Sequence, residues 1–179
     1  MFDLIIFSFA FGVLTKLADL FNEHGLREPF KGSSILAGIF WGIAGMGLIY
    51  FNPSLSVFYT ALVFYWLLSM KLDDKNHAIG GLIVILSSIK ICSLDLSAHV
   101  LEIIVIIFAY EITRYLQSVI KNGFIKRAIK LRLYIIPCFY SFYTRDYSVI
   151  IATLIAFSGI RCINKVFLAK KVKWLKNDD

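Results

Sequence analysis

The stretch that decides the fold is Ser34–Phe51, SILAGIFWGIAGMGLIYF, which contains no charged residue. A helix needs about 20 apolar residues to cross about 30 Å of hydrocarbon, and about 17 can be enough. Outward from this stretch, apolar runs continue along the chain as Phe2–Phe21, Ser34–Phe51, Leu55–Met70, Ala78–Leu94, Ala98–Tyr115, Leu131–Tyr143 and Ser148–Leu168. The sequence therefore predicts an all-α, polytopic transmembrane bundle of about seven spans, with residues 1–179 forming one integral membrane domain.

Composition supports lipid as the solvent of this chain. Hydrophobic residues make up 59% and charged residues 17%, against about 45–50% and about 25% in soluble domains. So few polar residues cannot cover the apolar surface of a soluble protein of this length. The net charge is +7, but the basic residues flank the apolar runs rather than forming one patch, which points to a membrane surface and not to nucleic acid.

The distribution of basic residues predicts the orientation. Lys and Arg accumulate on the cytoplasmic side of membrane proteins. With the N-terminus outside, all 19 Lys and Arg residues except Lys90 and Arg145 fall on the inner side. Leu131–Tyr143 is short and contains Pro137. We keep it as a span because the lysine-rich tail would otherwise lie outside. The predicted location is the cell membrane, with the C-terminus in the cytoplasm.

Small and charged residues inside the spans predict helix contacts. Gly38 and Gly42 form a small-xxx-small pair, which we expect to pack against another helix of the same chain rather than against a second copy. Lys90 and Glu102 lie equally far on either side of a tight polar turn. Because a charge in hydrocarbon is costly unless paired, we expect a structural ion pair between them.

The first segment with candidate site residues follows the first span. Lys16, Asp19 and Glu23 are each about one helical turn apart, so they share one face of a helix. His24 follows directly, and Arg27 lies just beyond. Lys16 and Asp19 fall in the last turns of the apolar run, where ionisable side chains usually face a cavity or a partner.

The second segment links the third and fourth spans. Within five residues it contains Asp73, Asp74, Asn76 and His77, and Lys71 precedes them. The predicted orientation puts this segment on the same side of the membrane as the first one. The two segments therefore offer carboxylates, imidazoles and cations to one cytoplasmic region.

This combination suggests a metal-dependent enzyme acting on a phosphorylated lipid or isoprenoid. Mg²⁺ or Mn²⁺ would bind carboxylates together with substrate phosphate, and Lys or Arg would hold the phosphate. The expected metal ligands are Asp19, Glu23, Asp73 and Asp74, the catalytic histidines are His77 and His24, and the phosphate-binding residues are Lys16, Lys71 and Arg27. The chain contains no GxSxG, P-loop, GxGxxG or HExxH motif that would define the chemistry further.

Three other interpretations remain open at this point. Short cytoplasmic loops are normally charged, so the candidate residues can be solvated neighbours without a function. A small transporter or channel is the second interpretation, although charge near the bilayer midplane and a repeat, both typical of transporters, are lacking. The third is a non-catalytic assembly subunit that binds anionic lipid or an acidic partner through the amphipathic stretch Val119–Lys130 and the basic tail 170–174. Membrane lipids are the expected partners, and the sequence leaves the oligomeric state open.

Overall fold

The computed structural model describes residues 1–22, 26, 28–69, 75–90, 96–120, 123 and 131–167. This part of the chain forms seven α-helices and one short 3₁₀ helix. The helices are α1 Phe2–Asn22, α2 Ser33–Phe51, η1 Pro53–Leu55, α3 Ser56–Leu68, α4 Lys75–Lys90, α5 Leu96–Val119, α7 Arg132–Thr144 and α8 Ser148–Phe167. Each predicted apolar run corresponds to one α-helix, so the prediction of an all-helical fold is confirmed for the described residues.

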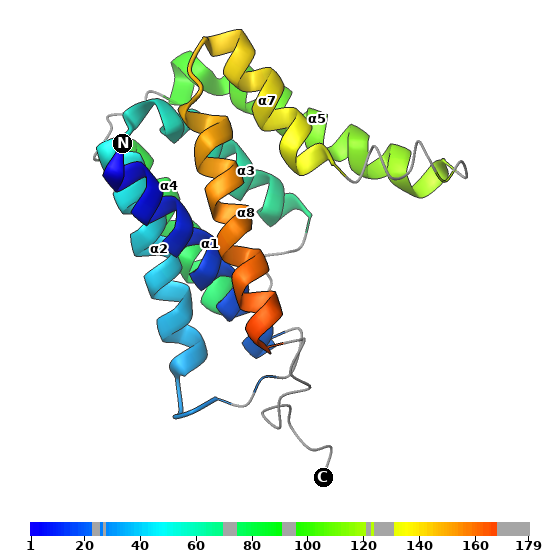
Figure 1. Cartoon of the computed structure of the whole chain (residues 1–179). Helices are drawn as coiled ribbons and strands as arrows, with labels where there is room; N and C mark the ends of the chain where they lie inside the picture. Colours follow the sequence, from blue (N-terminus) through cyan, green and yellow to red (C-terminus); the bar gives the residue numbers. More distant parts are fainter. Residues whose placement is uncertain are drawn as a thin grey trace.

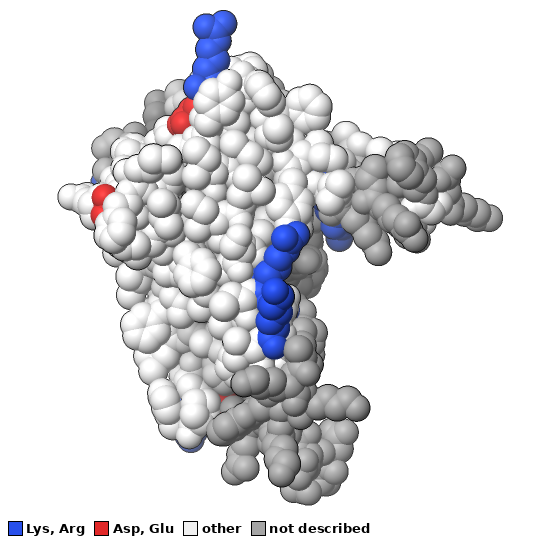
Figure 2. Space-filling view, viewed as in Figure 1, with Lys and Arg blue, Asp and Glu red and all other residues white. Residues whose placement is uncertain are grey.

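Three helices are long and apolar enough to cross a membrane, namely the segments Phe2–Phe21, Ser33–Phe51 and Ser148–Phe167. The apolar segment Pro53–Leu68 is shorter. Helix α7 has 13 residues, or about 20 Å at 1.5 Å per residue, which is less than the hydrocarbon core. Large apolar side chains are exposed on most helices, and Figure 2 shows a mostly uncharged face with basic side chains over the C-terminal half of α8. These are features of a membrane protein.

The helices alternate in direction. In Figure 1, α1, α3 and α8 run down the molecule from the end that carries the N-terminus, whereas α2 and α4 run up. Helices α5 and α7 lie obliquely and extend away from the other five. Helix α1 packs between α2 and α8, while α3 connects α5 to the rest of the bundle. The C-terminal ends of α1, α3 and α8 therefore lie at the same end of the bundle as the start of α4.

Glycines bring α2 and α4 into close contact. A Cβ atom at Gly38 would collide with the backbone of Asn76, and one at Gly42 would lie 2.9 Å from the Cα atom of Gly80. A Cβ atom at Gly80 would in turn collide with the indole of Trp41, which is fully buried. The predicted packing of Gly38 and Gly42 within the chain is confirmed, with α4 as the partner helix.

The predicted ion pair between Lys90 and Glu102 is wrong. Within the described residues, Glu102 pairs with His99, whose Nδ1 atom lies 3.0 Å from Glu102 Oε2, one turn earlier on the same helix. A neighbour on the same helix is held at this distance by helix geometry alone. Lys90 is the last residue of α4 and is exposed. The equal sequence distance of Lys90 and Glu102 from the turn therefore does not bring the two side chains into contact.

Candidate functional site

The candidate site is centred on Asp19, which joins α1 to α4. Its Oδ2 atom lies 3.1 Å from Lys16 Nζ, and its Oδ1 atom lies 3.1 Å from His77 Nε2. The His77 side chain is only 7% exposed and that of Lys16 is 13% exposed. The Asp19 side chain is 29% exposed, so its carboxylate is only partly removed from water, and pairing reduces the cost of that partial burial. Lys16 donates a hydrogen bond to Oδ2 of Asp19, and His77 Nε2 lies beside Oδ1.

Asn76 fixes the start of α4 against α1 next to this group. Its Nδ2 atom donates a hydrogen bond of 3.3 Å to the carbonyl oxygen of Ala18. Its Oδ1 atom accepts a 2.7 Å hydrogen bond from the backbone N–H of His77. Gly38 permits this arrangement because a side chain there would collide with the Asn76 backbone. The position of His77 thus depends on a glycine of α2 and on a backbone oxygen of α1.

A cavity of about 330 Å³ opens beside Lys16, Asp19 and His77, which belong to its wall. Most of its lining is apolar and comes from α1, α3 and α8, including Phe11, Phe58, Leu62, Trp66, Phe157 and Ile160. A volume of this size is at the lower end of small-molecule sites, which are mostly apolar with a few placed polar groups. The cavity and the charged group therefore form one site with a polar end and an apolar body.

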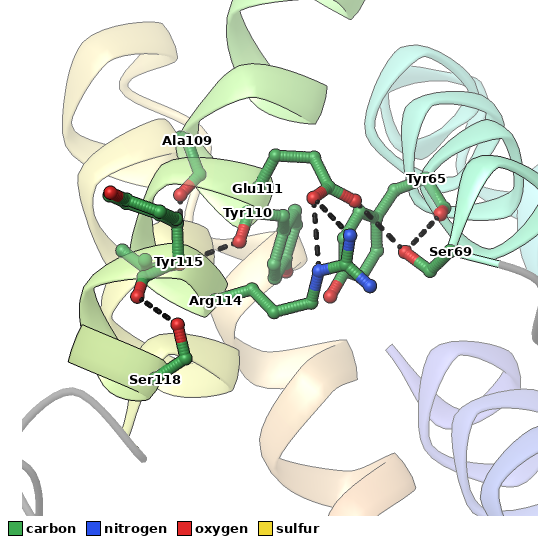
Figure 3. Close-up of polar contacts among 9 residues, drawn as sticks. Tyr65, Ser69, Ala109, Tyr110, Glu111, Arg114, Tyr115 and Ser118 are labelled. Atoms are coloured by element: carbon green, nitrogen blue, oxygen red, sulfur yellow. Dashed lines mark hydrogen bonds and ion pairs between the residues drawn. The ribbon is translucent and has the colours of Figure 1, made fainter.

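The boundary of the cavity towards α5 is made by stacked tyrosines. The rings of Tyr65 on α3 and Tyr110 on α5 have centroids 4.8 Å apart and planes inclined by 22°. Figure 3 shows that Glu111 extends from α5 to Ser69 at the end of α3, where the Ser69 hydroxyl donates a 3.1 Å hydrogen bond to Glu111 Oε1. Arg114 Nη2 lies 2.7 Å from Glu111 Oε2. These contacts attach the oblique helix α5 to the bundle next to the cavity.

Two polar residues of the cavity wall were missed by the sequence analysis. Arg132 is the first residue of α7 and Asn164 lies near the end of α8, and both line the cavity. Arg132 was counted only as a basic residue of the inner side, and Asn164 carries no motif. Their shared position could not be predicted, because α7 packs against α8 only in the folded bundle.

The structure unites part of the predicted site. Lys16 and Asp19 from the first segment meet His77 from the second, a contact that the sequence had left open. The other predicted site residues lie outside the described residues: Glu23, His24, Arg27, Lys71, Asp73 and Asp74. Most of the amphipathic stretch Val119–Lys130 and the lysine-rich tail also lie outside them.

A divalent metal would find only part of its expected ligand set here. In the part of the chain that the structure describes, no group of three or more His, Cys, Asp and Glu side chains is close enough to hold a metal ion. Both oxygens of Asp19 already contact Lys16 and His77. A metal at Asp19 would therefore have to compete with a lysine ammonium and an imidazole, and its remaining ligands would have to come from elsewhere.

Comparison with known proteins adds no information on function. No protein-family model matches the chain, and searches of curated proteins and of solved structures find no match either. A function must therefore be argued from the chemistry of the site itself.

Proposed function

We propose that this chain is a multi-pass enzyme of the cell membrane that binds a phosphorylated lipid or isoprenoid in the cavity. In this proposal, His77 removes a proton from the O–H group of a water molecule, whose oxygen attacks the phosphorus atom of a phosphomonoester. The P–O bond to the lipid alcohol breaks, the alcohol leaves with the proton returned by His77, and inorganic phosphate is released. The observation that supports it best is the distance of 3.1 Å between Asp19 Oδ1 and His77 Nε2 in the wall of a largely apolar cavity. A carboxylate beside a buried imidazole is a recurring arrangement of general bases.

The contact with Asp19 favours one tautomer of a neutral His77 imidazole. A neutral imidazole has one nitrogen that donates and one that accepts. Because the carboxylate of Asp19 only accepts, it favours the tautomer with the proton on Nε2. Nδ1 of His77 is then the nitrogen that accepts the proton from the attacking water. Asp19 orients the ring and stabilises the imidazolium that forms, as the carboxylate of a catalytic triad does.

The charge around the cavity suits an anionic head group. Lys16 and Arg132 are the cations of the described lining, and Asp19 is its carboxylate. In an environment of low dielectric constant, the electrostatic attraction between a phosphate and nearby cations is stronger than in water. The apolar part of the wall suits the beginning of a hydrocarbon chain. Both ends of a phosphorylated lipid thus have a counterpart in one cavity.

The proposed topology puts this site on the cytoplasmic side. The chain would cross the membrane about seven times, with the N-terminus outside and the C-terminus inside. The charged, imidazole and amide side chains of the cavity come from the last turns of α1 and α8 and from the starts of α4 and α7, namely Lys16, Asp19, His77, Arg132 and Asn164. Every one of these ends is an inner end in the orientation that the Lys and Arg distribution predicts. A lipid of the inner leaflet would have its phosphate at a similar depth.

Mg²⁺ or Mn²⁺ remains a separate prediction about the same site. Asp19 would be the one described ligand, and Glu23, Asp73 and Asp74 would have to complete the set. The proton transfer proposed for His77 does not depend on the metal, because Asp19 and Lys16 are provided by the chain. Metal binding and lipid binding can therefore be tested independently.

The decisive experiment compares turnover by the wild type and by His77→Gln. The full chain is reconstituted in nanodiscs with phosphatidic acid, a polyprenyl phosphate or, as a zwitterionic control, phosphatidylcholine. Lipid products and released phosphate are measured by mass spectrometry and a colorimetric assay. We expect conversion of a phosphorylated lipid that slows by about 10²–10⁴-fold in His77→Gln, the usual contribution of a general base.

His99→Gln is the matched control, because His99 also pairs with a carboxylate but does not line the cavity. It should retain wild-type turnover. If His77→Gln is as active as the wild type, the proposed role of His77 is wrong. If phosphorylated lipids bind without being converted, the cavity is a binding site, and the transport or assembly interpretation replaces the enzyme.

A further inference from the structure

Three buried polar atoms in the cavity wall lack a hydrogen-bond partner within the described structure, namely Nε2 of His77, Nε of Arg132 and Oδ1 of Asn164. Nε2 of His77 lies 3.1 Å from Asp19 Oδ1, so Arg132 and Asn164 are the two whose neighbour is not explained. Arg132 is held in place by its other end, because its Nη1 atom donates a hydrogen bond to Gln117 Oε1 on α5. Buried donors and acceptors nearly always find a partner in folded proteins, so an exception calls for an explanation.

The two atoms are chemically complementary. Nε of Arg132 is a donor with a full positive charge behind it, whereas Oδ1 of Asn164 is a neutral acceptor. A ligand that satisfies both presents an acceptor oxygen to Arg132, most favourably an anionic one, and an O–H or N–H hydrogen to Asn164. A singly protonated phosphomonoester has both on one phosphorus atom. A phosphodiester without a free hydroxyl can satisfy only Arg132.

We infer that Arg132 and Asn164 bind the head group of the lipid and select a phosphomonoester. Arg132 donates to an ionised phosphate oxygen, Asn164 accepts from the P–OH group, and Lys16 lies in the same cavity wall as a further cation. This inference rests on the proposed function and names the residues that select its substrate class. Phosphatidylcholine is disfavoured because its quaternary ammonium has no N–H that could donate to Asn164 in place of the P–OH, and because it would approach the cations Lys16 and Arg132.

The size of the cavity agrees with this assignment. A volume of about 330 Å³ is near the minimum for a drug-sized ligand. It accommodates a phosphate with its nearest carbon atoms and leaves the rest of the hydrocarbon chain among lipids. Selectivity should therefore depend on the head group and only weakly on chain length.

The test measures lipid binding by the full chain in detergent, by native mass spectrometry and by the rise in Tm. Probes are dioleoyl phosphatidic acid, dioleoyl phosphatidylmethanol, dioleoyl phosphatidylcholine and inorganic phosphate. Measurements at pH 5 keep the phosphomonoester close to one negative charge, since its second pKa is about 6. Phosphatidic acid and phosphatidylmethanol then differ mainly in the P–OH group. We expect the wild type to prefer phosphatidic acid over phosphatidylmethanol by about 10-fold or more.

The variants separate the two contacts. Arg132→Gln should weaken the binding of both anionic lipids by about 10-fold or more. Asn164→Leu should still bind both lipids but should no longer prefer phosphatidic acid. Arg161→Gln is the control, because Arg161 is exposed on α8 and does not line the cavity. If Arg132→Gln does not fold, Arg132→Lys keeps the charge without the planar guanidinium and should still weaken binding several-fold.

Each contrary result identifies what has failed. If Arg132→Gln and Asn164→Leu bind like the wild type while His77→Gln still abolishes turnover, this inference is wrong and the proposed function stands. If no anionic lipid raises the Tm of the wild type and none is converted, the proposed function itself is wrong. If inorganic phosphate raises the Tm as much as phosphatidic acid does, the site recognises free phosphate and the assignment to a lipid is overturned.

Discussion

Asp19 Oδ1 on α1 lies 3.1 Å from His77 Nε2 on α4, and this contact unites the two sequence segments that carry the candidate chemistry. It leads to a first prediction about Asp19 as a positioning residue. Asp19→Asn should reduce turnover of the lipid substrate by about 10²-fold or more, since an amide can hold the imidazole in the wrong tautomer. Asp19→Glu should recover part of the rate. The initial rate of lipid turnover is measured for both variants in nanodiscs. Equal rates for Asp19→Asn and the wild type would contradict the role of Asp19.

A second prediction concerns the close packing of α2 on α4. Gly38→Ala should lower the free energy of unfolding by about 1–3 kcal/mol, because overpacking of a tight contact displaces backbone. The displaced backbone belongs to Asn76, next to His77, so ligand binding should weaken as well. Thermal unfolding in detergent measures the effect. Gly123→Ala is the control, because nothing lies within 4 Å of a Cβ atom there, and it should change stability by less than about 0.5 kcal/mol.

A third prediction tests the orientation in the membrane. Lys31 and Arg145 are both exposed and lie in connections at opposite ends of the bundle. In a variant without Cys92, Cys138 and Cys162, a membrane-impermeant maleimide should label Arg145→Cys on intact cells. Lys31→Cys should react only after permeabilisation. The opposite labelling pattern would show that the N-terminus faces the cytoplasm.

A fourth prediction addresses the metal. Millimolar Mg²⁺ or Mn²⁺ should raise the Tm of the wild type, because a ligand that binds only the folded state stabilises it, by about 2.7 kcal/mol at 100 times its Kd. Asp19→Asn should abolish the rise. Lys16→Gln should preserve or enlarge it, since Lys16 competes for Asp19. Glu111→Gln, which alters a carboxylate paired with Arg114, is the control. A rise that persists in Asp19→Asn would locate the metal elsewhere.

A fifth prediction concerns the pH dependence of stability at the turn between α7 and α8. Partial burial raises the pKa of Asp146, but hydrogen bonds from Ser54 and Ser148 lower it by more, so the pKa of Asp146 is below its ordinary value. Its Oδ1 atom accepts a 2.9 Å hydrogen bond from the Ser148 N–H at the start of α8. A pKa that is lowered by folding contributes stability above the unfolded pKa of about 3.9, and this contribution is lost as the pH falls through the folded value.

Asp146→Ala should therefore lower the Tm at pH 7, with a loss of about 1 kcal/mol for a helix cap. The difference in Tm between Asp146→Ala and the wild type should become smaller as the pH falls below about 4. Asp146→Asn can still accept the Ser148 N–H and should resemble the wild type at pH 7 without the acid-dependent change. The Tm of the wild type and of both variants is measured between pH 3 and 7. A constant difference between Asp146→Ala and the wild type across that range would contradict the role of ionisation.

Much of the fold could be predicted from the chain alone. The apolar run Ser34–Phe51 and its counterparts defined seven helices, because the length and continuity of such runs are set by local composition. The alignment of Lys16 with Asp19 was also predictable, since residues three apart share a face of any helix. The short helix α7, Arg132–Thr144, shows where this reasoning ends, because its oblique position depends on neighbours and not on its own hydrophobicity.

The sequence by itself determined the helices, the surplus of apolar surface and the residues that bear charge, because each of these depends on composition or on residues within a few positions. Only the tertiary structure decided which charges meet. It joined Asp19 to His77 through the close α2–α4 contact at Gly38, separated Lys90 from Glu102, and brought Arg132 and Asn164 to the same cavity. Such contacts depend on how several helices cross, and helix crossing is set by the packing of whole faces rather than by any single segment.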